Sequence, residues 1–421
     1  EEPQAAVYAW LAARGEDWRK ELRAGDRLLV CDVGGGTTDL TLIEAVDHEG
    51  ELQLNRLAVG NHLLVGGDNM DLALAHRVAG LFKEKGVALN AWQSVALWHS
   101  CRLAKEALLA PGGPDSHPVA ILGRGSRVIG GTVSVDVPRS LVLELIVEGF
   151  FPSCGLHDRP QRRRASGFQE IGLPFEADAA ITRHVAAFVS TQGQVHDAGN
   201  LDASCPTHLL FNGGVFKATA LRDRLLATLR QWAVDLDPNH TVSELAGQRD
   251  LDFAVARGAA HYAWRKQRGG VRIRGGTARS YYIGIETAGL AIPGAPRPLK
   301  ALCVAPFGME EGTSAEVPHG EVGLVLGEPV HFRFFSSAVR PLDQPGALID
   351  DVPDVPDDDV EPELVETDSL ETTLASPDEG DDAYVPVRFE SRITELGMLE
   401  LWCVSTRTED RWKLEFSVRE S

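Results

Sequence analysis

A run of glycines between two apolar segments most constrains the fold of this 421-residue chain. Asp32 ends the apolar segment that begins at Arg27, the glycines occupy 34–36, and Thr37 and Thr38 open a second apolar segment. Such a pattern predicts two strands joined by a tight turn. Glycines also leave main-chain N–H groups open to a phosphate, and an aspartate at a strand end could hold Mg²⁺ through water. The alternative is a tight turn without a ligand.

Two further glycine pairs stand where strands and helices are expected. Gly66 and Gly67 precede a segment with helical periodicity. Gly213 and Gly214 lie between a buried apolar strand and a helix that we expect to run directly from them to about Trp232. Helix N-termini that are reached through glycines suit anions. Together, the three glycine motifs predict an anion site in an α/β domain.

The chain changes in character near residue 280. Short β-like segments alternate there with glycine and proline turns, and they return at 384 after an acidic stretch. This alternation is typical of a β-sandwich that a loop interrupts. We therefore expect an α/β domain over 1–270 and a β-sandwich over 278–421.

The negative charge is concentrated in that acidic stretch. The chain has 61 acidic and 41 basic side chains, a net charge of −20, and 16 of the acidic residues lie between 341 and 387, where no basic residue occurs. So many carboxylates repel one another, so we expect a disordered insert over 341–383, with docking of a basic partner as the alternative. The overall acidity argues against a general nucleic-acid binder.

The cysteines and the apolar runs exclude further classes. Six cysteines lie far apart without a CxxC pair, which disfavours a structural zinc site or a disulfide framework and indicates reduced thiols in a cytoplasmic protein. No apolar run approaches the roughly 20 residues of a membrane helix. We therefore expect neither a nucleic acid nor a membrane as a partner.

The motifs resemble those of the heat-shock-70 (DnaK-type) chaperones, which belong to the actin and sugar-kinase ATPase superfamily. Asp32 to Leu40 is similar to their second phosphate loop, and Gly213 to Lys217 is similar to their Gly-Gly-Ser-Thr-Arg motif. The likeness is strong to about residue 287 and weak beyond it. Six segments carry it: 1–6, 32–40, 66–71, 213–217, 252–260 and 282–287.

This resemblance implies an incomplete α/β ATPase lobe, ribonuclease-H-like and actin-type, followed by an all-β sandwich-like domain. The family's first phosphate loop and catalytic lysine would lie upstream of Glu1, so we expect a fragment that is inactive as an ATPase by itself. The resemblance further implies a stress-response chaperone that hydrolyses ATP and couples nucleotide state to the binding of unfolded or apolar peptide segments. A co-chaperone and a nucleotide exchange factor would be its other partners.

The resemblance also implies individual site residues. Glu2, Asp32 and Thr37 would be catalytic, and Asp32 would belong to the shell of a Mg²⁺ ion. ATP or ADP would contact the three glycine motifs and four side chains, namely Gly34, Gly35, Gly36, Gly66, Gly67, Gly213, Gly214, Thr38, Lys105, Lys217 and Asp252.

The segment that corresponds to the family's adenosine helix departs from the family pattern. The family's Cys-Glu-Arg-Ala-Lys-Arg is here Cys-Arg-Leu-Ala-Lys-Glu, so Arg102 replaces the acidic ribose contact and Glu106 replaces the adenine-stacking arginine. A nucleotide-binding regulatory or scaffold protein with little turnover is therefore an alternative. A small-molecule kinase is a further alternative that the β-rich C-terminal part disfavours.

Overall fold

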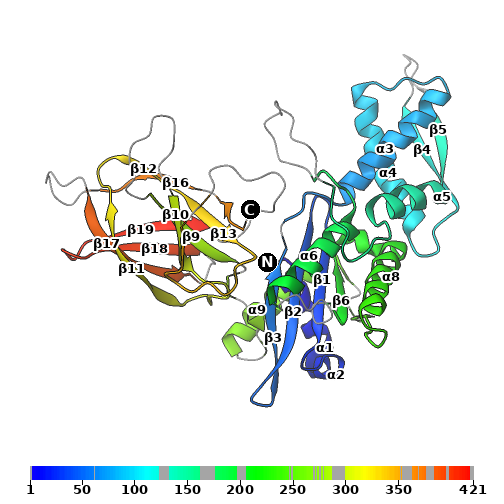
Figure 1. Cartoon of the computed structure of the whole chain (residues 1–421). Helices are drawn as coiled ribbons and strands as arrows, with labels where there is room; N and C mark the ends of the chain where they lie inside the picture. The colour runs from blue at the N-terminus through cyan, green and yellow to red at the C-terminus, as the bar shows by residue number, and fades with distance from the viewer. Residues whose placement is uncertain are drawn as a thin grey trace. The chain divides into compact units, whose positions relative to one another are not determined.

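The computed structural model divides the chain into two compact units, Glu1–Ile273 and Arg274–Ser421 (Figure 1). The described residues are 2–60, 62–122, 132–161, 176–196, 205–245, 247, 250–268, 271, 273–274, 276–277, 279–286, 299–350, 352, 363–367, 369–375, 384–394 and 398–417.

A six-stranded mixed sheet forms the centre of unit 1, in the order β7-β6-β1-β2-β3-β8. Strands β1, β2 and β3 form an antiparallel meander, whereas β6 runs parallel to β1 and β7 runs parallel to β6. The strands are β1 (Arg27–Val33), β2 (Thr38–His48), β3 (Glu51–Val59), β6 (His208–Asn212), β7 (Ser243–Glu244) and β8 (Ile273–Arg274). The glycine turn predicted from the sequence joins β1 to β2.

Helices cover both faces of this sheet, because β1 is apolar on both sides. Leu28 and Val30 pack in one cluster with α1 (Glu2–Arg14), whereas Leu29 and Cys31 pack with α6 (Ile181–His196) and α8 (Thr219–Leu236). Two short segments, η1 (Gly15–Asp17) and α2 (Trp18–Glu21), follow α1, and α9 (Ala254–Arg268) crosses it.

The crossing of α1 and α9 depends on a glycine. A Cβ atom at Gly258 would lie 1.7 Å from the carbonyl oxygen of Ala5. Only glycine therefore allows the two helices to approach so closely.

A group of helices and a hairpin extends from one end of this sheet (Figure 1). It contains α3 (Gly67–Glu84), α4 (Ala91–Leu109), β4 (Ser116–Leu122), β5 (Thr132–Pro138), α5 (Arg139–Val142) and the π-helical η2 (Leu143–Glu148). In this group the helix changes from α to π geometry after Val142.

The elements of unit 2 in its described residues are strands. A five-stranded sheet, β14-β10-β9-β13-β15, and a four-stranded sheet, β11-β17-β18-β19, share one hydrophobic core, and β12 pairs with β16 separately. The strands are β9 (Ser280–Glu286), β10 (Leu299–Ala305), β11 (Ser314–Leu324), β12 (Pro329–Phe332), β13 (Phe334–Ser337), β14 (Leu348–Ile349), β15 (Val365–Glu366), β16 (Leu370–Thr373), β17 (Val385–Ile393), β18 (Met398–Ser405) and β19 (Arg411–Ser417).

The expectation of a disordered acidic insert over 341–383 is wrong for its described residues. Three strands, β14, β15 and β16, come from this stretch and pair with β10, β13 and β12. Apolar side chains between the carboxylates, such as Ile349 and Val352, pack against the five-stranded sheet. The high charge density therefore did not prevent local packing. Residues 351, 353–362, 368 and 376–383 lie outside the description.

In the parts of the chain that the structure describes, no helix is both long enough and apolar enough to span a bilayer.

Candidate functional site

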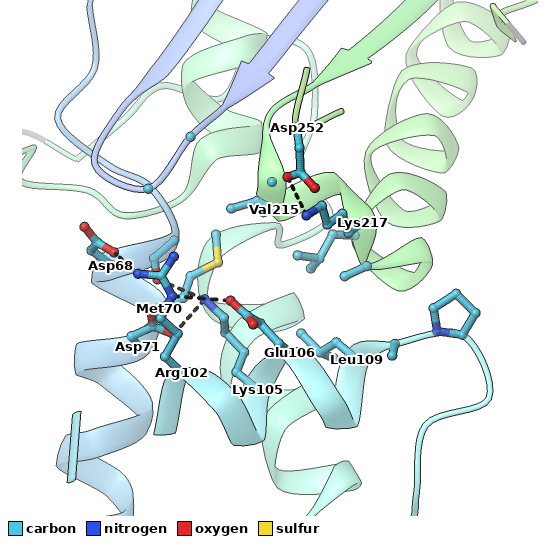
Figure 2. A pocket seen from close by; sticks show the side chains of 18 residues that line it. Asp68, Met70, Asp71, Arg102, Lys105, Glu106, Leu109, Val215, Lys217 and Asp252 are labelled. Carbon is cyan, nitrogen blue, oxygen red and sulfur yellow. Dashed lines mark hydrogen bonds and ion pairs between the residues drawn. The ribbon is translucent and has the colours of Figure 1, made fainter. Parts of the chain in front are cut away.

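The three glycine motifs meet at one pocket of about 350 Å³ in unit 1. The β1–β2 turn, the N-terminal end of α3, the C-terminal half of α4 and the segment from η3 (Gly214–Lys217) to the start of α8 surround it (Figure 2). The sequence-predicted residues that line this pocket are Gly34, Gly35, Gly67, Lys105, Gly214, Lys217 and Asp252. The fold thus brings together residues that are up to about half the chain apart in the sequence.

The second glycine pair packs directly on the first. The N–H of Gly67 donates to the carbonyl of Gly34 at 3.0 Å, and the N–H of Asp68 donates to that of Gly35 at 2.7 Å. A Cβ atom at Gly66 would lie 2.6 Å from the Gly35 oxygen. Gly66 is therefore a packing residue at this contact, which explains why glycine is needed there.

This packing changes the roles expected for two backbone donors. The N–H of Gly34 donates to the Thr37 carbonyl at 2.9 Å, and the N–H of Gly67 is bonded to Gly34. Both donors are thus engaged within the protein, contrary to the expectation that they face a phosphate. Gly35 and Gly36 are exposed in the turn, and of these two only Gly35 lines the pocket.

The third pair crosses over the end of β1. Gly213 has φ +86°, and a Cβ atom there would lie 2.1 Å from the Val33 carbonyl oxygen, so glycine is required on both counts. The expectation that these glycines open a long helix directly is wrong. The chain makes the short 3-10 segment η3, and extended backbone at Ala218 separates it from α8.

Asp32, at the end of β1, is a buried carboxylate that accepts a hydrogen bond from a neutral side chain. Its side chain is 4% exposed and accepts a hydrogen bond of 2.7 Å from Nδ2 of Asn212. Its pKa is raised to about 6, mainly by burial. The hydrogen bond from Asn212 lowers the pKa, whereas the charges of Glu2 and Asp39 also raise it. Glu2, exposed at the start of α1, is thus electrostatically close to Asp32, although neither residue lines the pocket.

The donor set at Asp32 fits a Mg²⁺ ion that arrives with a phosphate ligand. The described residues contain no group of three or more His, Cys, Asp or Glu side chains arranged to hold a metal by themselves. Mg²⁺ in phosphate sites is commonly held by one or two carboxylates, waters and phosphate oxygens. Burial and, to a smaller extent, two neighbouring carboxylates raise the pKa of Asp32, and a cation beside it would favour its ionised form.

The two threonines of the turn differ in their contacts. Thr38 is fully buried, and its hydroxyl donates to the Val65 carbonyl at 2.7 Å. The expectation that Thr38 contacts a nucleotide is therefore wrong, because this hydrogen bond ties β2 to the segment before α3. Thr37 is partly buried in the exposed turn and does not line the pocket.

Lys105 from α4 points into the pocket and is paired with Asp71, for which the sequence predicted no role. Its Nζ lies 2.7 Å from Oδ1 of Asp71 and donates to the Gly67 carbonyl at 3.1 Å. Burial raises the pKa of Asp71, and the hydrogen bond and charge of Lys105 oppose the rise. An aspartate on the apolar face of a predicted helix, one turn before Leu74, was the sequence feature that could have identified this pair.

Charged side chains alternate with apolar ones around the rest of the pocket (Figure 2). Arg102 Nε lies 3.3 Å from a carboxylate oxygen of Glu106, and Lys217 forms an ion pair with Asp252. The apolar lining includes Met70, Leu109, Val215 and Leu221, none of which the sequence motifs pointed to. A pocket with glycines and lysines beside an apolar wall suits a ligand with an anionic part and a planar, less polar part.

Comparison with known proteins gives a partial match. No protein-family model matches the chain. Over 91 residues, or 21% of this chain, it is 37% identical to the chaperone protein DnaK of Burkholderia cenocepacia, and the match covers 13% of that protein. One stretch of the chain is thus distantly related to a heat-shock-70 chaperone.

Proposed function

We propose that the pocket binds ATP or ADP together with Mg²⁺, and that the chain is part of a heat-shock-70-like chaperone. The observation that carries this proposal is the meeting of three glycine motifs and Lys105 at one pocket. The partial match to DnaK supports the same proposal. The ribonuclease-H-like, actin-type assignment of unit 1 belongs to it as well.

The residues present suit phosphate chemistry of this kind. Mg²⁺, when bound with the nucleotide, would neutralise charge on the phosphate oxygens. Asp32 would hold the ion through water, Thr37 and the exposed Gly35 would lie beside the phosphates, and Glu2 would add negative charge near the metal. Leu109, Val215 and Leu221 would take the less polar base.

Calorimetry with the chain and Mg-ATP or Mg-ADP tests the binding step. Gly35→Asp places a carboxylate at the pocket, where a new Cβ would meet Asp68 oxygens at an ordinary 3.6 Å. We expect this variant to weaken binding at least tenfold, or about 1.4 kcal/mol, through repulsion of the phosphates. Gly149→Asp is the matched control, because this exposed helical glycine has open space around it and lies outside the pocket lining.

Two results would contradict the proposal. Absence of binding at millimolar nucleotide would show that the pocket does not bind ATP or ADP. Equal weakening by Gly35→Asp and Gly149→Asp would mean that net charge, rather than this pocket, governs the interaction.

A regulatory or scaffold protein with little turnover is the second candidate. It is favoured by the pair of Arg102 and Glu106, which stands at the pocket where the family has the opposite charges. Nucleotide binding without measurable phosphate release would select this candidate. A small-molecule kinase is less well supported, because unit 2 is built from strands.

The chaperone part of the proposal concerns unit 2. Its β-sheets would bind unfolded or apolar peptide segments, with the nucleotide state, a co-chaperone and an exchange factor as regulators. Equal peptide affinity with Mg-ATP, with Mg-ADP and without nucleotide would contradict this coupling.

A further inference from the structure

The five-stranded sheet of unit 2 is apolar on both faces. On β9, Tyr281 and Ile283 face the core shared with the four-stranded sheet, whereas Tyr282 faces the opposite side. On β13, Phe334 and Phe335 divide in the same way. The second face of an antiparallel sandwich sheet is commonly polar and solvated. An apolar second face therefore requires a cover.

The acidic stretch provides that cover. Tyr282, Ala301, Cys303 and Phe335 are at most 2% exposed on the second face. The residues that pack on them from the acidic stretch are Ala347, Ile349, Val352 and Leu364. We name the described residues 343–350, 352 and 363–367 the strap.

The strap also closes both edges of the same sheet. On the β10 side, the N–H of Cys303 donates to the Ala347 carbonyl at 2.8 Å, and the N–H of Gly346 donates to the Cys303 carbonyl at 2.9 Å. On the β13 side, the N–H of Thr367 donates to the Phe334 carbonyl at 2.8 Å. The outer strands β14 and β15 contain only two residues each. The strap therefore forms main-chain hydrogen bonds with the edge strands β10 and β13 as an added strand would, but over a short length.

Ion pairs hold the strap at several points. Asp343 accepts hydrogen bonds from the Tyr282 hydroxyl at 2.8 Å and from Arg340 Nε at 2.7 Å. Arg333 donates to Glu366 at 2.8 Å, and Lys300 pairs with Asp350. The carboxylates of the strap thus meet cations on and beside the strands that they cover, which gives charge complementarity to the contact.

We infer that the strap is an intramolecular occupant of a binding surface, and that the covered face and edges of the five-stranded sheet take an extended apolar polypeptide when the strap leaves. A free strand edge supplies main-chain hydrogen bonds to such a peptide, and the apolar face supplies contacts to alternate side chains. The short pairing of β14 and β15 makes the strap the displaceable part. This inference rests on the peptide-binding part of the proposed function and deepens it by naming the surface and its intramolecular occupant; its test uses no nucleotide, so its failure would leave the nucleotide-binding proposal untouched.

The test neutralises three of the carboxylates that hold the strap and keeps nearly the same side-chain shape, while the ion pair of Glu363 with Arg340 stays in place. The variant Asp343→Asn, Asp350→Asn, Glu366→Gln changes only strap residues in the full chain. Its matched control, Glu390→Gln, Glu400→Gln, Glu415→Gln, loses the same charge from ion pairs with Arg411 and Lys413 on the other sheet. The probe is a fluorescent nine-residue peptide in which valine alternates with serine, compared with a version that contains proline at the serine positions.

We expect the strap variant to bind the valine–serine peptide at least about tenfold more tightly than the parent chain, because the binding-competent fraction rises. Amide exchange of β10 and of residues 363–367 should also accelerate. The control variant should change neither quantity, and the proline peptide should bind neither variant. Val352→Ser, which removes an apolar contact of the strap alone, should act in the same direction.

Three results would overturn the inference. Faster exchange without peptide binding would mean that the covered face is not a binding surface. Unchanged exchange in both Val352→Ser and the triple variant would mean that these contacts do not hold the strap. Self-association in sedimentation without peptide binding would identify a second copy, rather than a peptide, as the alternative occupant.

Discussion

The ion pair of Lys105 and Asp71 allows the structural and ligand-binding roles of the pocket to be separated. Asp71 is 1% exposed, and its ion-pair contact with Lys105 spans 2.7 Å. Lys105→Met keeps most of the side-chain volume but leaves the carboxylate buried without its cation. Breaking a buried pair from one side costs about 3–5 kcal/mol. Because the Lys105 side chain is 11% exposed, we expect a loss near the lower end, about 3 kcal/mol.

The double variant Lys105→Met, Asp71→Leu completes this experiment. Replacing both charges with apolar groups of similar size is often neutral, so we expect it to recover most of the free energy of unfolding. Amide exchange of α3 and α4 peptides in a urea series measures this quantity for unit 1, because tryptophans in both units complicate fluorescence. Mg-ADP calorimetry on the same proteins then reports the second role of the lysine.

The outcomes distinguish the roles clearly. If Lys105 contacts the nucleotide, the double variant is stable yet binds Mg-ADP weakly. Recovery of both stability and affinity would assign the lysine a structural role only. A loss below about 1 kcal/mol in Lys105→Met would refute the reasoning itself, because that is the magnitude of an exposed pair.

Two further predictions concern the end of β1. The pKa of Asp32 rises from 3.8 to about 6 in the folded state. At about 1.4 kcal/mol per pKa unit, the ionised side chain therefore destabilises the folded state by about 3 kcal/mol above pH 6. This destabilisation decreases as the pH falls from 6 toward 3.8. Asp32→Asn should therefore stabilise unit 1 by about this amount at pH 7.5 in metal-free buffer and by about half at pH 5, and a pH-independent effect would contradict the burial argument. Gly213→Ala should destabilise unit 1 by at least about 2 kcal/mol, because this position has a positive φ and a new Cβ would collide with the Val33 carbonyl. Gly36→Ala is the control: this position has open space around it, so the free energy of unfolding should change by less than about 1 kcal/mol. Equal effects of the two substitutions would refute the steric account.

Local sequence patterns made the glycine turn predictable. The side-chain partners in the candidate site were not predictable, because they depend on contacts between residues far apart in the chain. Three glycines between two apolar segments have few conformational alternatives, and the structure has the turn at that place. The direction of the Thr38 hydroxyl was not predictable in this way. It depends on Val65, which lies 27 residues further along the chain. The Lys105 partner, 34 residues earlier, was missed for the same reason.

Charge counting misled the interpretation of the acidic stretch. Its 16 carboxylates suggested a chain that repels itself, but this count ignores the cations that they meet after folding. Ala347 and Ile349 are two residues apart, which is the spacing of a strand that packs on one face. This short alternation was visible in the sequence. The partners Lys300, Arg333 and Arg340, by contrast, lie upstream of the stretch and required the fold.

The charges at the pocket indicate how a phosphate ligand would be accommodated. Among the described lining residues, the three cations are each paired with a carboxylate: Arg102 with Glu106, Lys105 with Asp71 and Lys217 with Asp252. The Lys217 pair is more than half exposed, so its exchange for a phosphate costs little, whereas the Lys105 pair is buried and its exchange costs more. Lys217 is therefore the cation that should turn toward the ligand first. The remaining neutralisation would have to come from Mg²⁺ beside Asp32, so binding of nucleotide to this pocket should depend on Mg²⁺.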